Sequence, residues 1–204
     1  MKHPNIFVIT DEIYEHINFV DGHVSIAQFP EIKERVILVN GVSKSYAMTG
    51  YRIGYMAAAP WIAKACNKLQ GQMTTNASTI AQRASIEALN GDQSVVKDFR
   101  KAFERRRDFV YNIISQIKGV KCNKPDGAFY VFPDISSFFG KSAEGRTINN
   151  SDDMSFYLLE KAMVATVPGS GFGNDKCIRI SYATSDEKLT EAMKRLKNAL
   201  EKIV

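Results

Sequence analysis

The fold is decided by the stretch Ser43-Lys44-Ser45-Tyr46-Ala47-Met48-Thr49-Gly50-Tyr51-Arg52-Ile53-Gly54 and by the apolar runs on either side of it. Val36-Ile37-Leu38-Val39 precedes the stretch and ends at Asn40-Gly41, while Ile53-Gly54-Tyr55-Met56-Ala57-Ala58 overlaps its end. Runs that are apolar throughout are typical of strands in a sheet covered on both faces, which usually means a parallel α/β sheet. The polar stretch is therefore predicted to connect two buried strands.

A third apolar run, Ile6-Phe7-Val8-Ile9, ends at Thr10-Asp11 and leads into Glu12-Ile13-Tyr14. In open α/β sheets, ligands bind beyond the carboxyl ends of the strands. If this run and the run at 36–39 form neighbouring strands, the side chains of Asp11, Tyr14 and Lys44 converge on one cleft. An acid, a phenol and an amine at a dry strand end are hard to explain as packing. Arg52 would add a fixed cation, suited to bidentate phosphate binding.

This set of side chains matches the needs of pyridoxal 5′-phosphate. A lysine amine forms a Schiff base with the cofactor aldehyde. A carboxylate pairs with the pyridinium nitrogen, so that the ring acts as an electron sink. A phenol hydrogen-bonds the ring oxygen, and an arginine takes the phosphate. The stretch around Lys44 therefore points to this cofactor.

Four ordered motifs carry a family resemblance. They are a D-E-x-Y element at 11–14, an S-K-x-x-x-x-x-G-x-R-x-G signature at 43–54, a P-x-G-A-F-Y turn at 125–130 and an R-I-S-Y-A element at 179–183. With these motifs the sequence resembles the fold-type I pyridoxal-phosphate enzymes, and among them the class I aminotransferases of the aspartate aminotransferase group. The order and spacing of the motifs agree along the whole chain.

The resemblance implies a role for each residue of the candidate cofactor site. Lys44 would be the Schiff-base lysine and the general acid and base of the proton shift. Asp11 would pair with the pyridine nitrogen, and Tyr14 would hydrogen-bond the ring hydroxyl. Arg52 would bind the cofactor phosphate, with Ser43 lining the same side.

The resemblance also implies the reaction and the partners. Arg179 would bind the substrate α-carboxylate as a bidentate fork. The reaction would be ping-pong transamination between an amino acid and a 2-oxo acid, with L-aspartate and 2-oxoglutarate as the pair, in a homodimer. Two alternatives stay open: an aminotransferase acting on aromatic, branched or prephenate-type substrates, and a non-catalytic fragment that folds but binds no cofactor.

The resemblance covers only the C-terminal half of the family chain. The other half would carry the glycine-rich phosphate loop, the aromatic side chain that stacks on the ring and an asparagine that bonds the ring oxygen. The implied fold is α/β, with the second half of a pyridoxal-phosphate large domain, mostly parallel in its sheet, at residues 1–100. A small C-terminal α/β domain would follow at 101–204 and carry Arg179.

Helical patterns and turn signals fill in the remaining elements. The expected helices are 60–70, 78–89, 93–118, 152–161 with Ser151 or Asp152 as its N-cap, and 185–203 capped by Ser185. The expected strands of the second half are 120–122, 128–132, 164–167 and 177–182. The polar segment 136–151 is predicted to be a surface loop. The long helix at 93–118 could bridge two domains.

Composition sets limits on the function. The net charge is only +5, from 27 basic and 22 acidic residues, and the basic cluster at 100–107 reads as a solvated helix face. Without a recognition motif we expect no nucleic-acid binding. No apolar run approaches the ~20 residues of a membrane span, so no span is expected. The three scattered cysteines fit a reducing, cytoplasmic setting.

A glycine-rich segment and three histidines could suggest a dinucleotide site or a metal site, but neither has the spacing that such a site requires. Gly169-Ser170-Gly171-Phe172-Gly173 is G-x-G-x-G and not the dinucleotide pattern G-x-G-x-x-G. It is predicted to be a turn that leads to Arg179. The histidines His3, His16 and His23 have no metal-ligand spacing, so no metal site is expected.

Overall fold

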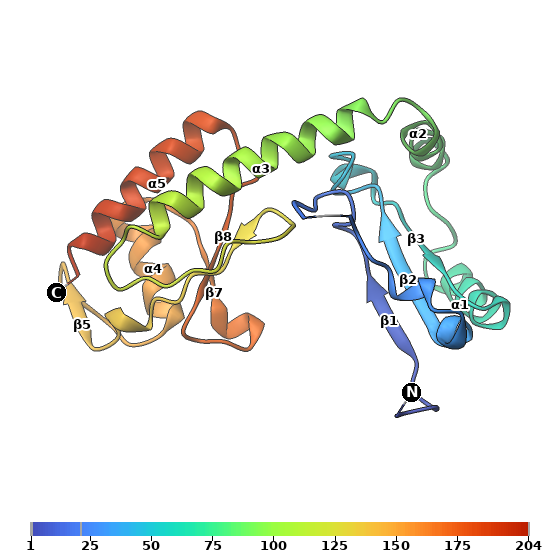
Figure 1. Cartoon of the computed structure of the whole chain (residues 1–204), viewed down its shortest axis with the longest axis horizontal. Coiled ribbons are helices and arrows are strands. Elements are labelled where there is room, and N and C mark those ends of the chain that lie inside the picture. Colours follow the sequence, from blue (N-terminus) through green and yellow to red (C-terminus); the bar gives the residue numbers. More distant parts are fainter. Residues whose placement is uncertain (1, 21, 204) are drawn as a thin grey trace. The chain divides into compact units, whose positions relative to one another are not determined.

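The computed structural model describes residues 2–20 and 22–203. The chain divides into two compact units, one up to Arg100 and one from Lys101 onward. Helix α3, Ser94–Ile114, contains residues of both units and is drawn as one continuous helix in Figure 1. Each unit has its own sheet, and each is described by itself below.

The first unit contains a three-stranded sheet in the order β1-β2-β3. Strand β1, Val8–Asp11, pairs in parallel with β2, Val36–Gly41. Strand β3, Gly54–Ala57, pairs antiparallel with β2, so the sheet is mixed. The prediction of three consecutive strands is confirmed, but the prediction that they are buried holds only for β2. Strand β1 alternates between half-buried and exposed residues, with Ile9 72% exposed, and most of β3 is exposed.

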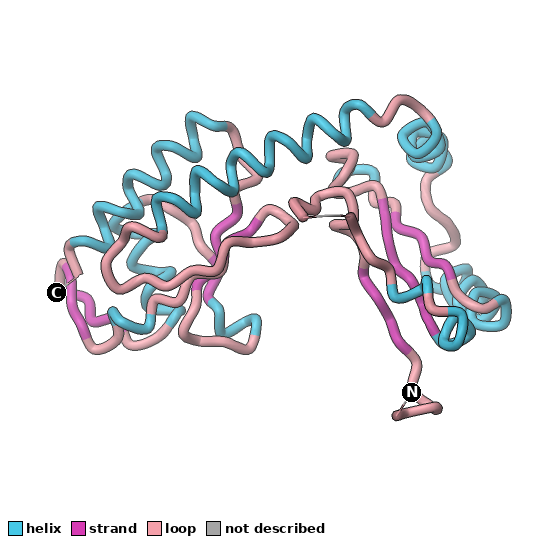
Figure 2. The backbone as a smooth tube through the Cα atoms, in the orientation of Figure 1, coloured by secondary structure: helices cyan, strands magenta, loops and turns pink. Residues whose placement is uncertain are grey.

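In the described part of this unit, helices α1 and α2, short 3-10 segments and the first residues of α3 accompany the sheet. Helices are cyan in Figure 2. Helix α1, Pro60–Met73, begins at a proline, whose missing N–H is not needed in the first turn. Helix α2, Thr79–Asn90, ends at Gly91, where a Cβ atom would lie 2.7 Å from the Glu87 carbonyl oxygen. The 3-10 segments are Ile26–Gln28, Pro30–Arg35 and Thr49–Tyr51.

The second unit is built on an antiparallel sheet in the order β4-β8-β7. Its strands are Tyr130–Val131 (β4), Ile178–Ser181 (β8) and Val167–Pro168 (β7). Helix α4, Ser151–Ala162, contacts β7, β8 and helix α5, Asp186–Glu201. The two helices also share a buried hydrogen bond, in which Tyr157 Oη donates to the Ala199 carbonyl at 3.0 Å.

The predicted surface loop at 136–151 is wrong, because the segment contains a 3-10 turn, Ser136–Phe138, and a hairpin. Strands β5, Lys141–Ala143, and β6, Arg146–Ile148, are joined by Glu144 and Gly145. Both turn residues have positive φ angles, 48° and 81°. That is the geometry of the two-residue turns that match the twist of a hairpin.

Several element ends also differ from the prediction. Helix α3 stops at Ile114, because residues 115–118 continue as tight turns in which Gln116 and Ile117 bond the carbonyls three residues back. The predicted strand 120–122 is reduced to one isolated bridge between Lys121 and Asp134. The N-cap of α4 is Asn150, whose Oδ1 accepts from the Asp153 amide at 2.8 Å. The predicted Ser185 cap of α5 is confirmed.

The predicted strand 164–167 begins later than expected, as β7 at Val167. Met163 adopts a left-handed conformation with a φ of 54°, and the Val164 amide donates to the Leu158 carbonyl. The C-terminal end of α4 therefore includes Val164, the first residue of the predicted strand, in its hydrogen bonding. The glycine-rich segment is a 3-10 turn, Gly169–Phe172, as its pattern predicted.

Candidate functional site

The parallel pairing of β1 and β2 places their carboxyl ends at one edge of the sheet. Asp11 lies opposite Val39, and the Glu12 amide donates to the Val39 carbonyl at 2.9 Å. The turn that contains Tyr14 and the turn that contains Lys44 both start from this edge. The condition for convergence of the predicted cofactor residues, that these two strands are neighbours, is therefore met.

Asp11 stands at the end of β1 with its carboxylate exposed. Its Oδ1 accepts a hydrogen bond from the Ile13 amide at 3.1 Å, which is an Asx-type turn. Tyr14 follows in the same turn, half-buried, and its carbonyl accepts from the Ile17 amide. Because a local backbone bond fixes only one carboxylate oxygen of Asp11, the other has room for a second donor.

Lys44 is half-buried and lies in a turn closed by a bond from the Ala47 amide to its carbonyl, at 3.2 Å. A close backbone approach before this turn and a hydrogen bond from within it restrict its position. Before the turn, a Cβ atom on Gly41 would lie 2.8 Å from the Ile53 carbonyl oxygen, so only glycine lets β2 approach that residue. Within the turn, Tyr46 Oη donates to Gln93 Oε1 at 2.9 Å.

Arg52 is exposed and adopts a left-handed backbone conformation, with a φ of 56°. Its Nη1 donates to the Thr49 carbonyl at 3.0 Å. A non-glycine residue rarely takes this conformation, which costs about 1 kcal/mol or more. The surrounding turn therefore holds Arg52 in a fixed position immediately before β3.

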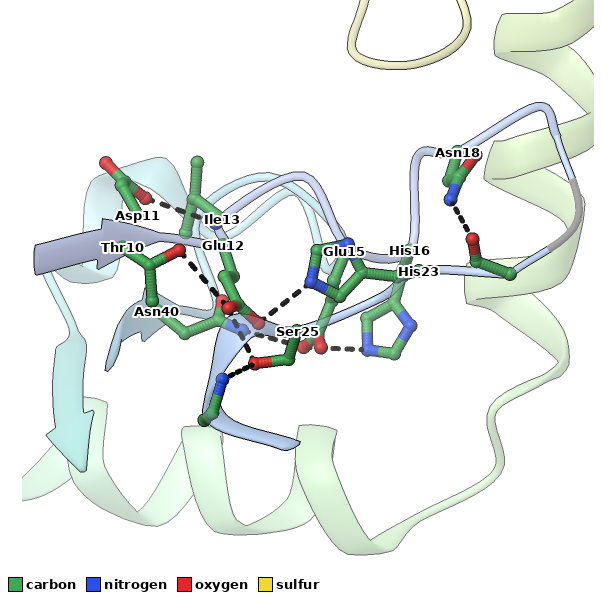
Figure 3. Close-up of polar contacts among 12 residues, drawn as sticks. Thr10, Asp11, Glu12, Ile13, Glu15, His16, Asn18, His23, Ser25 and Asn40 are labelled. Carbon is green, nitrogen blue, oxygen red and sulfur yellow. Dashed lines mark hydrogen bonds and ion pairs between the residues drawn. The ribbon is translucent and has the colours of Figure 1, made fainter. Parts of the chain in front are cut away.

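The structure adds a network that sequence reasoning missed, centred on Glu12 (Figure 3). This side chain is only 5% exposed. Its Oε1 accepts from Ser25 Oγ at 2.7 Å and from Thr10 Oγ1 at 3.2 Å, and its Oε2 lies 2.8 Å from His23 Nε2. Burial alone would raise the pKa of Glu12, but the hydrogen bonds from Ser25 and His23 outweigh it and lower the pKa.

A second link joins the end of β2 to the turn after β1. Asn40 is buried, and its Nδ2 donates to Glu15 Oε1 at 2.7 Å while its Oδ1 accepts from the Gly41 amide at 2.7 Å. The pKa values of Tyr46 and Tyr55 are both raised, first by burial and then by the charge of Glu15. In the sequence, the signal for this hydrogen bond is the polar side chain of Asn40 directly after the apolar run Val36–Val39.

In the second unit, Arg179 lies on β8 against two aromatic rings. Its Cζ is 4.5 Å from the ring centroid of Tyr130 on β4 and 4.3 Å from that of Phe172. The spacing of the motifs gave no sign of these rings as partners of the arginine. Lys44 and Arg179 belong to different units.

The turn that presents Tyr130 is fixed by a buried arginine. Arg107 is 6% exposed, with its Nη1 3.3 Å from the Pro125 carbonyl and its Nε 2.8 Å from Asp108 Oδ1. The prediction of a solvated helix face at 100–107 is therefore wrong at this residue. Ala128 has a φ of 60°, and its carbonyl accepts from Tyr182 Oη at 3.2 Å.

The described residues include few other candidates for ligand chemistry. Within 2–20 and 22–203, no group of three or more His, Cys, Asp and Glu side chains is placed to hold a metal ion. None of the helices in this part of the chain has the length and apolar character of a membrane-crossing segment.

Comparison with known proteins identifies the family. The family model described as aminotransferase class I and II matches residues 1–196. The chain belongs to this family. Its two signature turns, at Asp11–Tyr14 and at Ser43–Gly54, leave the same edge of the first sheet.

Curated relatives support the same placement. The bifunctional aspartate aminotransferase and glutamate/aspartate-prephenate aminotransferase of Petunia hybrida is 47% identical over 204 residues, which is 98% of this chain and 43% of that protein. A probable aspartate/prephenate aminotransferase of Rickettsia prowazekii is 48% identical over 201 residues, 97% of this chain and 50% of that protein. The chain thus spans about half the length of these relatives.

Solved structures agree in fold. The aspartate aminotransferase of Rhizobium meliloti superposes with a TM-score of 0.95 at 44% identity, covering all of this chain and 52% of that one. The aromatic aminotransferase of Pyrococcus horikoshii gives a TM-score of 0.86 at 41% identity, covering 96% of this chain and 51% of that one. The predicted fold class, part of a pyridoxal-phosphate transferase large domain plus a small α/β domain, is confirmed.

Proposed function

We propose that this chain supplies the cofactor-attachment lysine and the substrate-carboxylate arginine of a pyridoxal-phosphate-dependent aminotransferase. The observation that carries the proposal is the parallel register of β1 and β2, which starts the turns of Asp11 and Lys44 from one sheet edge. The family match and the aminotransferase names of the relatives support the reaction class.

The residues at this edge fit the chemistry of pyridoxal 5′-phosphate. Asp11 offers a carboxylate with one oxygen beyond its local bond, and Lys44 offers a half-buried amine in a turn closed by a backbone hydrogen bond. Arg52 offers a guanidinium on a backbone held in one conformation. A carboxylate pairs with the ring nitrogen of the cofactor, an amine reacts with its aldehyde, and a guanidinium binds its phosphate.

When bound, pyridoxal phosphate supplies an electron-withdrawing ring conjugated to the substrate α-carbon. Lys44 Nζ would hold the cofactor by its aldehyde and would also serve as the general acid and base for the proton of the substrate α-carbon. Asp11 would keep the ring nitrogen protonated, and Tyr14 would donate to the ring oxygen. Arg52 and Ser43 would hold the phosphate.

Arg179 would bind the α-carboxylate of an amino acid or a 2-oxo acid through its planar fork. The proposed pair is L-aspartate and 2-oxoglutarate, which the aspartate aminotransferase names of relatives support. Prephenate-type substrates are the alternative that the bifunctional Petunia relative suggests. Initial rates with a panel of amino donors separate the two.

Two further assignments belong to the same proposal. A homodimer is expected, to be checked by sedimentation equilibrium. A cytoplasmic location is expected as well, supported by free thiols at all three cysteines.

Borohydride reduction tests the proposal directly. The chain is mixed with pyridoxal phosphate, reduced and digested, and mass spectrometry locates the pyridoxyl group. It is expected on Lys44, absent in Lys44→Ala, and unaffected in Lys64→Ala, which removes an exposed lysine of α1. Labelling spread evenly over exposed lysines would overturn the proposal.

A non-catalytic role is the second candidate. It is favoured by apolar side chains that the first unit leaves exposed, among them Trp61 at 60% and Ile80 at 78%. Such a surface is typical of one that another polypeptide segment covers. Correct folding without any adduct at Lys44 would support this candidate over the first.

A further inference from the structure

The outer face of the β4-β8-β7 sheet gathers one cation among aromatic rings. On the inner face, Val131 pairs with Ile180 and both are buried. Because side chains alternate along a strand, Tyr130 and Arg179 point to the opposite, outer face. Val167, the β7 neighbour of Arg179, is 41% exposed, so this face is open beside the guanidinium.

Phe172 reaches the same arginine from a rigid turn. A Cβ atom on Gly169 would lie 2.2 Å from the Asn174 carbonyl oxygen, so the turn can close only around a glycine. Ser170 bonds back to α4, with its amide 3.2 Å from Ser151 Oγ. The ring of Phe172 is further supported edge-on by Phe132, at a centroid distance of 6.1 Å. The ring therefore has little freedom to leave the arginine.

We infer that Tyr130 and Phe172, here called the aromatic clamp, are positioning residues that hold the Arg179 guanidinium for an in-plane carboxylate. The inference rests on the proposed function. Ring faces within 4.5 Å of Cζ attract the cation and restrict its rotation. Within the part of the chain that is described, no hydrogen bond or ion pair engages this guanidinium, so its N–H fork is unused.

The clamp also limits the class of ligand. A guanidinium that lies against aromatic rings presents its in-plane N–H edge, and a carboxylate matches that edge with two parallel hydrogen bonds. An aromatic ligand would have to displace a ring of the clamp in order to stack. The substrate side chain is therefore recognised by residues outside the clamp, and the clamp acts only on the binding of the carboxylate.

The test is an NMR titration of the ¹⁵N-labelled 204-residue chain with sodium propionate, following the Arg179 Nε–Hε signal. In the wild type, the rings shift the arginine side-chain protons upfield. Tyr130→Leu and Phe172→Leu should each remove part of that shift and weaken propionate binding about two- to fivefold. Tyr130→Phe and Phe172→Tyr keep a ring and should restore wild-type affinity.

Phe156 provides a matched control, because it is 48% exposed, as Phe172 is, and lies 4.4 Å from the Cζ of Arg146. Phe156→Leu should leave propionate binding unchanged. Unchanged affinity in both leucine variants of the clamp, or equal weakening in Phe156→Leu, would overturn the inference. Failure of the borohydride test at Lys44 would instead remove the proposed function and leave this measurement standing.

Discussion

Replacing Glu12 should destabilise the first unit by an amount that depends on how many of its hydrogen bonds the new side chain keeps. Thr10 and Ser25 both donate to Oε1, whereas His23 lies against Oε2. Glutamine keeps one oxygen and can present it to Thr10 and Ser25, so Glu12→Gln should cost about 1 kcal/mol, mainly for the lost charge. Leucine leaves all three partners facing an apolar group, which should cost about 3 kcal/mol at the low end of the usual penalties.

Urea unfolding followed by tryptophan fluorescence measures both values. Trp61 is the single tryptophan of the chain and lies edge-on to Phe7 at 5.9 Å, so it reports on the first unit. Glu31→Leu, at an exposed position, is the control and should change stability by less than about 0.5 kcal/mol. If Glu12→Leu lost less than about 1 kcal/mol, the network would not hold this segment and the reasoning would be refuted.

Three more predictions concern the pH dependence of the Glu12 network, the close approach at Gly41 and the hydrogen bond of Tyr182. The lowered pKa of Glu12 means that its contribution to stability is fully present above its unfolded-state pKa near 4.5 and is lost as pH falls through the lower folded-state pKa. The stability difference between wild type and Glu12→Gln should therefore shrink toward zero only as pH falls below about 4.5. Gly41→Ala should lower the urea midpoint markedly because its Cβ would lie 2.8 Å from a carbonyl oxygen, whereas Gly50→Ala, with open space around it, should not. Tyr182→Phe should cost about 1 kcal/mol by removing the bond to Ala128, and an unchanged thermal midpoint would contradict that bond.

The sequence was sufficient where periodicity and turn chemistry decide the structure. Continuous apolar runs located β1, β2 and β3, and the Ser185 cap located the start of α5. It failed at the Glu144-Gly145 hairpin, where polar residues form strands only because two positive φ angles close the turn. It also failed at Arg107, since the pattern of a helix cannot say which of several arginines faces a carbonyl such as that of Pro125.

The candidate site also has a part that the sequence predicted and a part that it did not. The motifs predicted the roles of Asp11 and Lys44, and the pairing of β1 with β2 places their turns at one edge of the sheet. The Glu12 network could not be predicted, because His23 and Ser25 reach it from eleven and thirteen residues along the chain through a loop with no periodicity. The rings beside Arg179 depend on strand register and on a turn near Gly169, neither of which a motif encodes.

The left-handed backbone of Arg52 has a consequence for engineering the candidate phosphate side. At most positions, alanine is the neutral probe of a charged side chain. Here Arg52→Ala leaves a Cβ atom on a backbone with a φ of 56°, so the loss of the guanidinium is mixed with conformational strain. Arg52→Gly removes the charge and relieves the strain, and Arg52→Asn removes the charge with a residue that tolerates this conformation. The pair separates what the side chain contributes to anion binding from what the backbone contributes to the shape of the turn.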